Sequence, residues 1–386
     1  MEESFFYKYL MQYHFIFYIY NYMDYTYPKI RLGLCCINMS LKYLEDVFTN
    51  RKIILKQIEK RGLEETKNLA KENVIDLLKL IFWNKNHGID VFRISSVLVP
   101  HATNKDLIKL FGKEGEDFLT LNFLSPYLEL VGHLAKIENM RLTFHPGQFV
   151  QVASPDLDIF SRSVDEIEMH TNFLDQMKLD KNSVAVIHIG GTYCAKEETI
   201  LRFIERFESL PKKLRDRLVL ENDEKCYDAS DVISICEKVG APMVLDIFHY
   251  YCYKKYHPDI IQMSLDDLIP RILETWKIRN MRPKFHLSEQ QIGSPVGAHS
   301  VFVELIPIDL LEIPTKYGVE IDIMIEAKGK EIAIAKLYEK YPDLKPKFRK
   351  DLPQTIPKQA LKELKYETKI QANENMELAN CRCKKS

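Results

Sequence analysis

The sequence carries almost no net charge, contains no paired cysteine motif and has few glycines. Its 54 Lys and Arg stand against 55 Asp and Glu, a net charge of −1. No overall positive field therefore favours nucleic acid, and attraction for DNA would have to come from local basic patches and bound cations. None of the eight cysteines forms a CxxC pair, which is typical of reduced intracellular thiols and not of a small secreted disulfide framework.

The first 28 residues are rich in Phe and Tyr but fit neither a membrane anchor nor an export signal. Five polar or charged residues interrupt the apolar run over residues 5–27: Lys8, Gln12, His14, Asn21 and Asp24. No basic segment followed by a small-residue cleavage site is present. We expect a flexible extension, an intracellular protein (nucleus and cytoplasm not distinguished) without a membrane role, and Met23 as a candidate start of translation.

Short β-branched runs alternate with amphipathic stretches between residues 30 and 340. The predicted strands are Lys29–Ile37, Asp90–Ser95, Arg141–His145, Val184–Ile189, Arg217–Glu221, Pro242–Ile247, Pro283–Leu287 and Glu320–Glu326. Helical periodicity fills the intervals, as over Glu64–Asn86, Arg162–Met177 and Ala229–Val239. This alternation favours an α/β fold with parallel pairing, most economically a closed (β/α)8 TIM barrel. An open doubly wound sheet would need a glycine-rich phosphate turn after the first strand, and residues 34–40 contain none.

The end of the chain is basic. From Lys345 onward it has 11 Lys and Arg against 5 Asp and Glu, with prolines at 346, 353 and 357. We therefore expect an extension over 1–28, the barrel over 29–341 and a loosely attached basic tail over 342–386. The tail is interpreted as solvated, with a DNA-following arm as the alternative.

Histidines and carboxylates gather at the ends of successive predicted strands. They are His145, His188, Glu221, Asp246 with His249, His286 with His299 in the loop behind it, and Glu326. In a TIM barrel this rim carries the catalytic residues. A single histidine at a strand end is more often a hydrogen-bonded structural residue, but a series at consecutive strands predicts a metal centre.

The donor types constrain the metal and leave the reaction open. Mixed imidazole and carboxylate ligands suit Zn²⁺, Mn²⁺ or Fe²⁺ better than Mg²⁺. Eight candidates are too many for one tetrahedral site, so we expect two or three divalent ions. Lys284 lies two residues before His286 and therefore faces the same side of its strand. Buried there, it needs an ion pair with a barrel carboxylate or a role as ligand or phosphate contact. Phosphodiester hydrolysis and sugar isomerisation both remain open.

A series of motifs between residues 30 and about 335 resembles the UV damage endonucleases. In order, they are IRLG at 30–33, FRISS at 92–96 with LVP at 98–100, HPGQF at 145–149, HIGGTY at 188–193, LENDE at 220–224, PKFHLS at 283–288, GAH at 297–299 and EAKGK at 326–330. Each piece alone is weak, whereas their ordered combination is specific.

The resemblance implies a TIM-barrel DNA repair endonuclease with a cluster of divalent ions, commonly manganese, with zinc or magnesium as alternatives. Such enzymes nick damaged double-stranded DNA directly 5′ of UV photoproducts without ATP, leaving a 3′-hydroxyl and a 5′-phosphate. We expect the chain to act as a monomer without a membrane. The matching positions make metal ligands of His145, His188, Glu221, Asp246, His249, His286, His299 and Glu326.

The resemblance also assigns residues beyond the ligands. Lys284 matches a lysine that can be carboxylated to bridge metals, which would place it with Glu221 and His286 in catalysis. Gln148 and Phe149 match the pair that probes the helix at the lesion, where damaged bases cost less to unstack. Asn38 matches a polar residue near the lesion pocket.

Three positions depart from the family pattern. Leu34 stands where a Tyr is frequent, Phe149 lacks the hydroxyl of the Tyr found in some members, and Asn104 replaces a His after the second strand. His101 is the candidate substitute for that missing histidine. The alternatives left open are an abasic-site endonuclease of the multi-zinc barrel type, a sugar isomerase or epimerase, and a lesion-binding protein with a degenerate site.

Overall fold

The computed structural model describes residues 28–347 and 349–364. Its strands are β1 (Ile30–Cys35), β2 (Val91–Arg93), β3 (Arg141–Thr143), β4 (Ala185–His188), β5 (Leu218–Glu221), β6 (Met243–Asp246), β7 (Lys284–Leu287) and β8 (Ile321–Ile325). Every strand pair is parallel, in the order β3-β2-β1-β8-β7-β6-β5-β4. Phe144, directly after β3, bridges Ala185 of β4 and closes the ring. The predicted (β/α)8 barrel is confirmed, and each strand lies within the range predicted for it.

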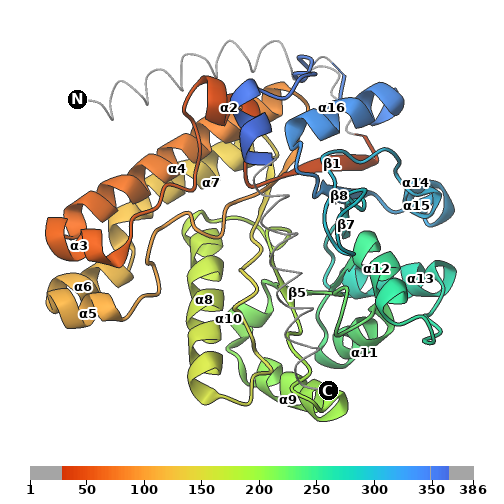
Figure 1. Ribbon diagram of the computed structural model, residues 1–386, viewed down its shortest axis with the longest axis horizontal. Coiled ribbons are helices and arrows are strands. Elements are labelled where there is room, and N and C mark those ends of the chain that lie inside the picture. Colours follow the sequence, from red (N-terminus) through yellow and green to blue (C-terminus); the bar gives the residue numbers. More distant parts are fainter. Residues whose placement is uncertain (1–27, 348, 365–386) are drawn as a thin grey trace.

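Helices surround the strands on the outside (Figure 1). The long ones are α4 (Leu63–Asn86), α7 (Ser125–Ile137), α8 (Leu157–Gln176), α9 (Lys196–Ser209), α11 (Ala229–Val239), α13 (Leu265–Ile278) and α16 (Glu331–Lys340). Shorter ones are α2 (Met39–Leu44), α3 (Leu55–Arg61), α5 (Asp106–Phe111), α6 (Lys113–Leu119), α10 (Lys212–Arg215), α12 (Ile247–Tyr256), α14 (Ile308–Leu311), α15 (Ile313–Lys316) and the 3-10 turns η1 (Asn122–Leu124) and η2 (Pro342–Leu344). Within the described ranges, no helix is long and apolar enough to cross a bilayer.

An ionic cluster fills the barrel at the amino-terminal ends of its strands. Asp322 of β8 is fully buried, and three guanidinium groups surround it. Arg31 donates to it at 2.7 and 2.9 Å, Arg141 at 2.7 Å, and Arg282 forms an ion pair at 2.9 Å. Burial alone would raise the pKa of Asp322, but the three arginines hold it well below its usual value. This end of the barrel is therefore closed by charge pairing, and the opposite rim carries the histidines.

Above this cluster a small group of apolar side chains packs inside the barrel. Inward-facing residues alternate along each strand, and Cys35, Val91 and Met324 pack together there. A Cβ on Gly33 would lie 3.0 Å from the Met324 side chain and 3.1 Å from Val91. Glycine at this point of the IRLG motif therefore makes room for Met324 below the rim.

The described part of the predicted tail packs against the barrel. Ala360 and Leu364 are buried against Met39 of α2, and Lys42 donates to Glu363 at 2.9 Å. Leu352 is buried as well. The division at residues 28 and 341 stays a prediction, and the remainder of both predicted extensions, 1–27 and 365–386, lies outside the described residues.

Candidate metal centre

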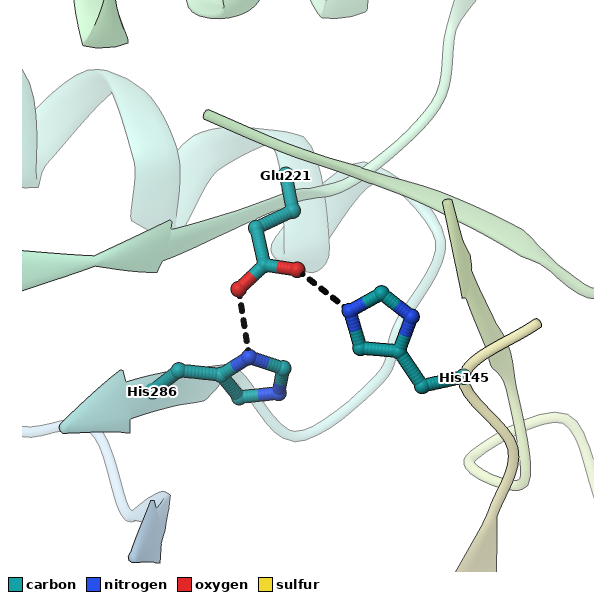
Figure 2. A group of neighbouring side chains, drawn as sticks. All are labelled: His145, Glu221 and His286. Carbon is teal, nitrogen blue, oxygen red and sulfur yellow. Dashed lines mark hydrogen bonds and ion pairs between the residues drawn. The ribbon is translucent and has the colours of Figure 1, made fainter. Parts of the chain in front are cut away.

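Glu221, at the carboxyl end of β5, stands at the centre of the rim. It is 1% exposed, and Figure 2 shows its carboxylate between His145 and His286. His145 Nε2 lies 2.8 Å from Glu221 Oε2, and His286 Nδ1 lies 2.5 Å from Oε1. His188 Nε2 adds a third contact at 3.4 Å. One buried carboxylate thus joins the ends of three other strands.

Two groups of side chains at this rim could hold a metal ion. The first is His145, Glu221 and His286, and the second is Glu221, Asp246, His286 and Glu326. In each group one ligand atom per residue lies within 4.8 Å of the others. Because Glu221 and His286 belong to both, the two groups form one continuous centre.

The remaining predicted ligands continue from this centre as a row of imidazole rings. Ring centroids are separated by 5.9 Å between His286 and His145, 5.2 Å between His145 and His188, 5.9 Å between His188 and His249, and 6.3 Å between His249 and His299. The structure therefore brings all eight predicted ligands to one rim, with His188, His249 and His299 beside the two groups rather than in them.

Local structure positions Asp246 and His249. Asp246 caps α12, because its Oδ1 accepts from the backbone N–H of Phe248 at 2.8 Å and of His249 at 2.9 Å. Its backbone N–H donates to Asn222 Oδ1 at 2.9 Å, and Asn222 Nδ2 donates to its carbonyl at 3.0 Å. The cap and this amide pair fix the ends of β5 and β6 together and leave Asp246 Oδ2 without a hydrogen-bond partner.

Backbone carbonyls set the tautomer of three histidines. The Nδ1 atoms of His145, His249 and His299 face the carbonyl oxygens of Pro146, Asn222 and Glu326 at 3.1, 3.0 and 2.8 Å, respectively. A carbonyl only accepts, so Nδ1 carries the proton and, in the neutral ring, Nε2 carries the lone pair. Metal-binding histidines are oriented in this way.

Three buried polar atoms of the candidate ligands have no hydrogen-bond partner. They are His188 Nδ1, His286 Nε2 and Asp246 Oδ2. Buried polar atoms are nearly always satisfied in native proteins, and these three belong to the residues with metal-ligating chemistry. The donor set and its unsatisfied atoms therefore fit a divalent cation.

The electrostatics keep the carboxylates of Glu221 and Glu326 ionised. Burial would raise the pKa of Glu221, but His286, His188 and His145 lower it well below its usual value. For Glu326 burial is likewise outweighed by Arg93, which forms an ion pair with it, and by His286.

The histidines divide according to their surroundings. Burial lowers the pKa of His188 and of His286, which favours the neutral, metal-binding form. For His249, burial is outweighed by Asp246, Glu221 and Glu224, which raise its pKa to about 9.

Lys284 is fully buried one layer below the centre. Its Nζ donates to Thr143 Oγ1 at 3.1 Å, and no ion pair joins it to another described residue. The ion pair with a barrel carboxylate, one of the two alternatives for Lys284, is therefore not found among the described residues. Burial and the neighbouring Arg93 and Arg141 lower the pKa of Lys284 to about 7.

The residues expected to probe DNA lie in different surroundings. Phe149 and Gln148 follow His145 in the loop after β3, both are exposed, and the Phe149 side chain is 84% exposed. Asn38 is 1% exposed and caps α2, with its Oδ1 accepting from Leu41 N–H at 2.9 Å. Its Nδ2 has no partner, so Asn38 is a buried cap and its contact with a lesion stays a prediction.

His101 does not replace the histidine absent at Asn104. Its Nε2 donates to the Ile53 carbonyl at 2.8 Å, and its Nδ1 accepts from Asn104 Nδ2 at 3.0 Å. With one ring nitrogen bonded to Ile53 and the other to Asn104, His101 has no free ligand atom for the candidate metal centre. Leu34 is fully buried, so it offers no surface to a ligand.

Two residues of the site were missed by sequence reasoning. Arg93, within the FRISS motif, pairs with Glu326 across 233 positions of sequence. Gln151, two residues beyond the HPGQF motif, joins the loops behind His145 and His188. Sequence spacing does not reveal these contacts, because Glu326 is distant from Arg93 in the chain and the Gly191 turn is 40 positions from Gln151.

Comparison with known proteins agrees on one family. A family model described as UV-endonuclease UvdE matches residues 30–357. A protein of Acanthamoeba polyphaga mimivirus, provisionally named a UV-damage endonuclease, is 39% identical over 318 residues, 82% of this chain and 92% of that protein. The UV-damage endonuclease of Schizosaccharomyces pombe is 37% identical over 325 residues, 81% of this chain and 50% of that protein. The crystal structure of SacUVDE matches with a TM-score of 0.67 at 29% identity, covering 82% of this chain and 100% of that one.

Proposed function

The chain belongs to the UV-endonuclease UvdE family, and we propose that it is a metal-dependent DNA repair endonuclease that nicks duplex DNA immediately 5′ of UV photoproducts. The products would be a 3′-hydroxyl and a 5′-phosphate, made by one protomer acting alone. The observation that carries metal dependence is the pair of ligand groups sharing Glu221 and His286.

The eight rim residues would hold two or three divalent ions, manganese first, with zinc or magnesium as alternatives. When bound, such ions supply an activated water and stabilise the leaving oxygen of a phosphodiester. Glu221 would serve both groups of ligands, since it belongs to each and its two oxygens face different histidines. The carbonyls behind His145, His249 and His299 would hold their Nε2 lone pairs toward the metals.

Lys284 would act from below the centre. With a pKa lowered to about 7, much of its amine is unprotonated at neutral pH. Such an amine can add to carbon dioxide and release a proton, which gives a carbamate. The buried cation would then become an anionic ligand beside Glu221 and His286, and the cost of burying an unpaired ammonium would disappear.

Gln148 and Phe149 would recognise the damage. Moving an exposed aromatic ring from water into the gap between unstacked bases is favourable in free energy, because the ring stacks on the bases. Photoproducts lower the cost of opening that gap. Because this loop begins at His145, the probe would read the duplex next to the metal centre, with Asn38 at the edge of the same rim.

A nicking assay on four duplexes tests this function. Each contains one cyclobutane dimer, one 6-4 photoproduct, one abasic site or no damage, and each is incubated with the full chain and Mn²⁺. Nicking of one or both photoproduct duplexes, with the undamaged one intact, is expected. Cleavage of the abasic duplex alone would refute the proposed substrate, and binding to photoproducts without any cleavage would refute the enzyme.

A further inference from the structure

The side chain of Gln151 bridges two loops of the catalytic rim. Its Nε2 donates to the carbonyl of Gln148 at 2.8 Å, within the predicted damage probe. Its Oε1 accepts from Gly191 N–H at 3.0 Å and from the Tyr193 hydroxyl at 2.9 Å, in the turn that follows His188. One amide therefore connects the probe with the turn behind a candidate metal ligand.

Only an amide in this orientation satisfies both sides. The probe offers a carbonyl, which needs a donor, and the glycine turn offers an N–H and a hydroxyl, which need an acceptor. A carboxylate would keep the contacts to the turn and place oxygen against the Gln148 carbonyl. A thioether of similar length would lose all three hydrogen bonds.

The glycine turn is shaped around this amide. Gly190 has φ +111°, and a Cβ there would lie 2.5 Å from Gln151 Oε1. The second glycine of the HIGGTY motif presents the N–H that Gln151 accepts. The turn therefore fits Gln151 closely, and a displacement of the amide would be transmitted to the backbone directly after β4.

Hydrogen bonds from α8 and α9 fix the backbone around Gln151. Its own N–H donates to Ser163 Oγ of α8 at 2.8 Å. From α9, Arg202 donates to the Ala153 carbonyl at 2.8 Å and Arg206 to the Val152 carbonyl at 2.9 Å. The probe is thus attached to a fixed base, and its side-chain link runs to the turn after His188.

We propose that Gln151 is a positioning residue that couples insertion of the Gln148–Phe149 probe to the geometry of the β4 end at the metal centre. Force on the probe carbonyl passes through the amide to Gly191 and Tyr193, and from there to the chain behind His188. Nicking would then follow only when the probe is seated. This inference rests on the proposed function and adds a residue to it.

Four variants of the full chain separate the two sides of the bridge. Gln151→Met removes all three hydrogen bonds of the amide. Gln151→Glu disrupts only the contact with the Gln148 carbonyl, and Tyr193→Phe removes only the hydrogen bond from the Tyr193 hydroxyl. Gln176→Met is the matched control, because Gln176 ends α8 far from the rim and accepts from Ser125 at 3.1 Å.

Two signals are measured on a duplex with one cyclobutane dimer and 2-aminopurine next to it, with Mn²⁺ and excess enzyme. Fluorescence reports unstacking by the probe, and product formation gives the single-turnover nicking rate. For Gln151→Met we expect unstacking to persist while nicking slows roughly 10- to 100-fold, as misplacement near a reacting centre does. The nicking rate of Gln151→Glu should be close to that of Gln151→Met, and the rate of Tyr193→Phe should fall less. The control Gln176→Met should nick at the wild-type rate.

The outcomes discriminate clearly. Wild-type nicking in Gln151→Met would overturn the coupling. A joint loss of unstacking and nicking, in proportion to a lower melting temperature, would also overturn it, because Gln151 would then only hold the loop together. A wild-type chain that unstacks but never nicks would instead refute the proposed function, so the two failures are distinguishable.

Discussion

Replacing Glu221 by Gln should abolish the stabilisation of the protein by metal. Gln has the same size, but it has no negative charge and its NH₂ group is no ligand. Glu221 belongs to both candidate groups and faces three histidines. Mutating residues that merely orient ligands costs about 10- to 100-fold in metal affinity, so loss of a shared ligand should raise the dissociation constant by about 100-fold or more.

The consequence for stability follows from linkage. At a metal concentration about 100 times the wild-type dissociation constant, binding stabilises the fold by about 2.7 kcal/mol. At the same metal concentration, a variant that binds the metal about 100-fold more weakly is stabilised by only about 0.4 kcal/mol. The unfolding entropy is about 2.1 cal/mol/K per residue, over roughly 340 described residues. The melting temperature should therefore rise by about 4 °C in wild type and by less than about 1 °C in Glu221→Gln.

The assay is thermal unfolding of metal-stripped protein titrated with Mn²⁺, Zn²⁺ or Mg²⁺. Glu237→Gln is the control, since this exposed residue pairs with Arg271 on the outside of the barrel. Without metal, Glu221→Gln should unfold cooperatively, because the amide oxygen can still accept a hydrogen bond. Equal metal-induced shifts in wild type and Glu221→Gln, or no shift in wild type with any ion, would refute the reasoning.

Three further predictions concern other parts of the barrel. Asp322→Asn removes the buried negative charge that Arg31, Arg141 and Arg282 share and should lower the free energy of unfolding by about 3–5 kcal/mol in urea. Because the folded-state pKa of Asp322 is lowered, the difference from wild type should be complete above about pH 5, above the unfolded value of about 3.9, and should shrink as pH falls toward the folded pKa; a pH-independent difference would contradict this. Lys284→Met should keep or raise the melting temperature, because a buried ammonium without an ion pair is removed, and should abolish nicking; retained nicking would remove Lys284 from catalysis. Phe149→Ala should weaken binding to a dimer-containing duplex by about 1–3 kcal/mol in a fluorescence titration, whereas Phe149→Tyr should match wild type; equal affinities for all three would exclude the stacking role.

The barrel was predictable because its signals are local. Strand and helix periods alternate eight times along the sequence. Few folds other than a closed barrel pair eight such strands in parallel. The strands predicted to end on His145 and Glu326 extend too far at the rim, because there the chain leaves the ladder before the candidate ligand. His145 follows Thr143, the last residue of β3, and Glu326 follows Ile325, the last of β8.

The candidate ligands could be listed from the sequence, but their arrangement could not be predicted. The positions of the strand ends predicted that all candidates lie on one rim. Sequence spacing does not reveal that Glu221 lies between three histidines, or that one oxygen of Asp246 accepts the hydrogen bonds that cap α12. His101 illustrates the limit. Proximity in sequence suggested a ligand, whereas a long-range bond to Ile53 occupies one ring nitrogen and Asn104 the other.

The most direct test of a metal-dependent nick beside UV damage is mapping of the cleaved bond at single-nucleotide resolution. Metal-stripped full chain is incubated with an end-labelled duplex containing one cyclobutane dimer, with chelator or with added Mn²⁺. A single cut directly 5′ of the dimer, bearing a 3′-hydroxyl that a polymerase extends, should arise only with Mn²⁺. Cutting in the presence of chelator, on the 3′ side of the dimer or equally in undamaged DNA would contradict it.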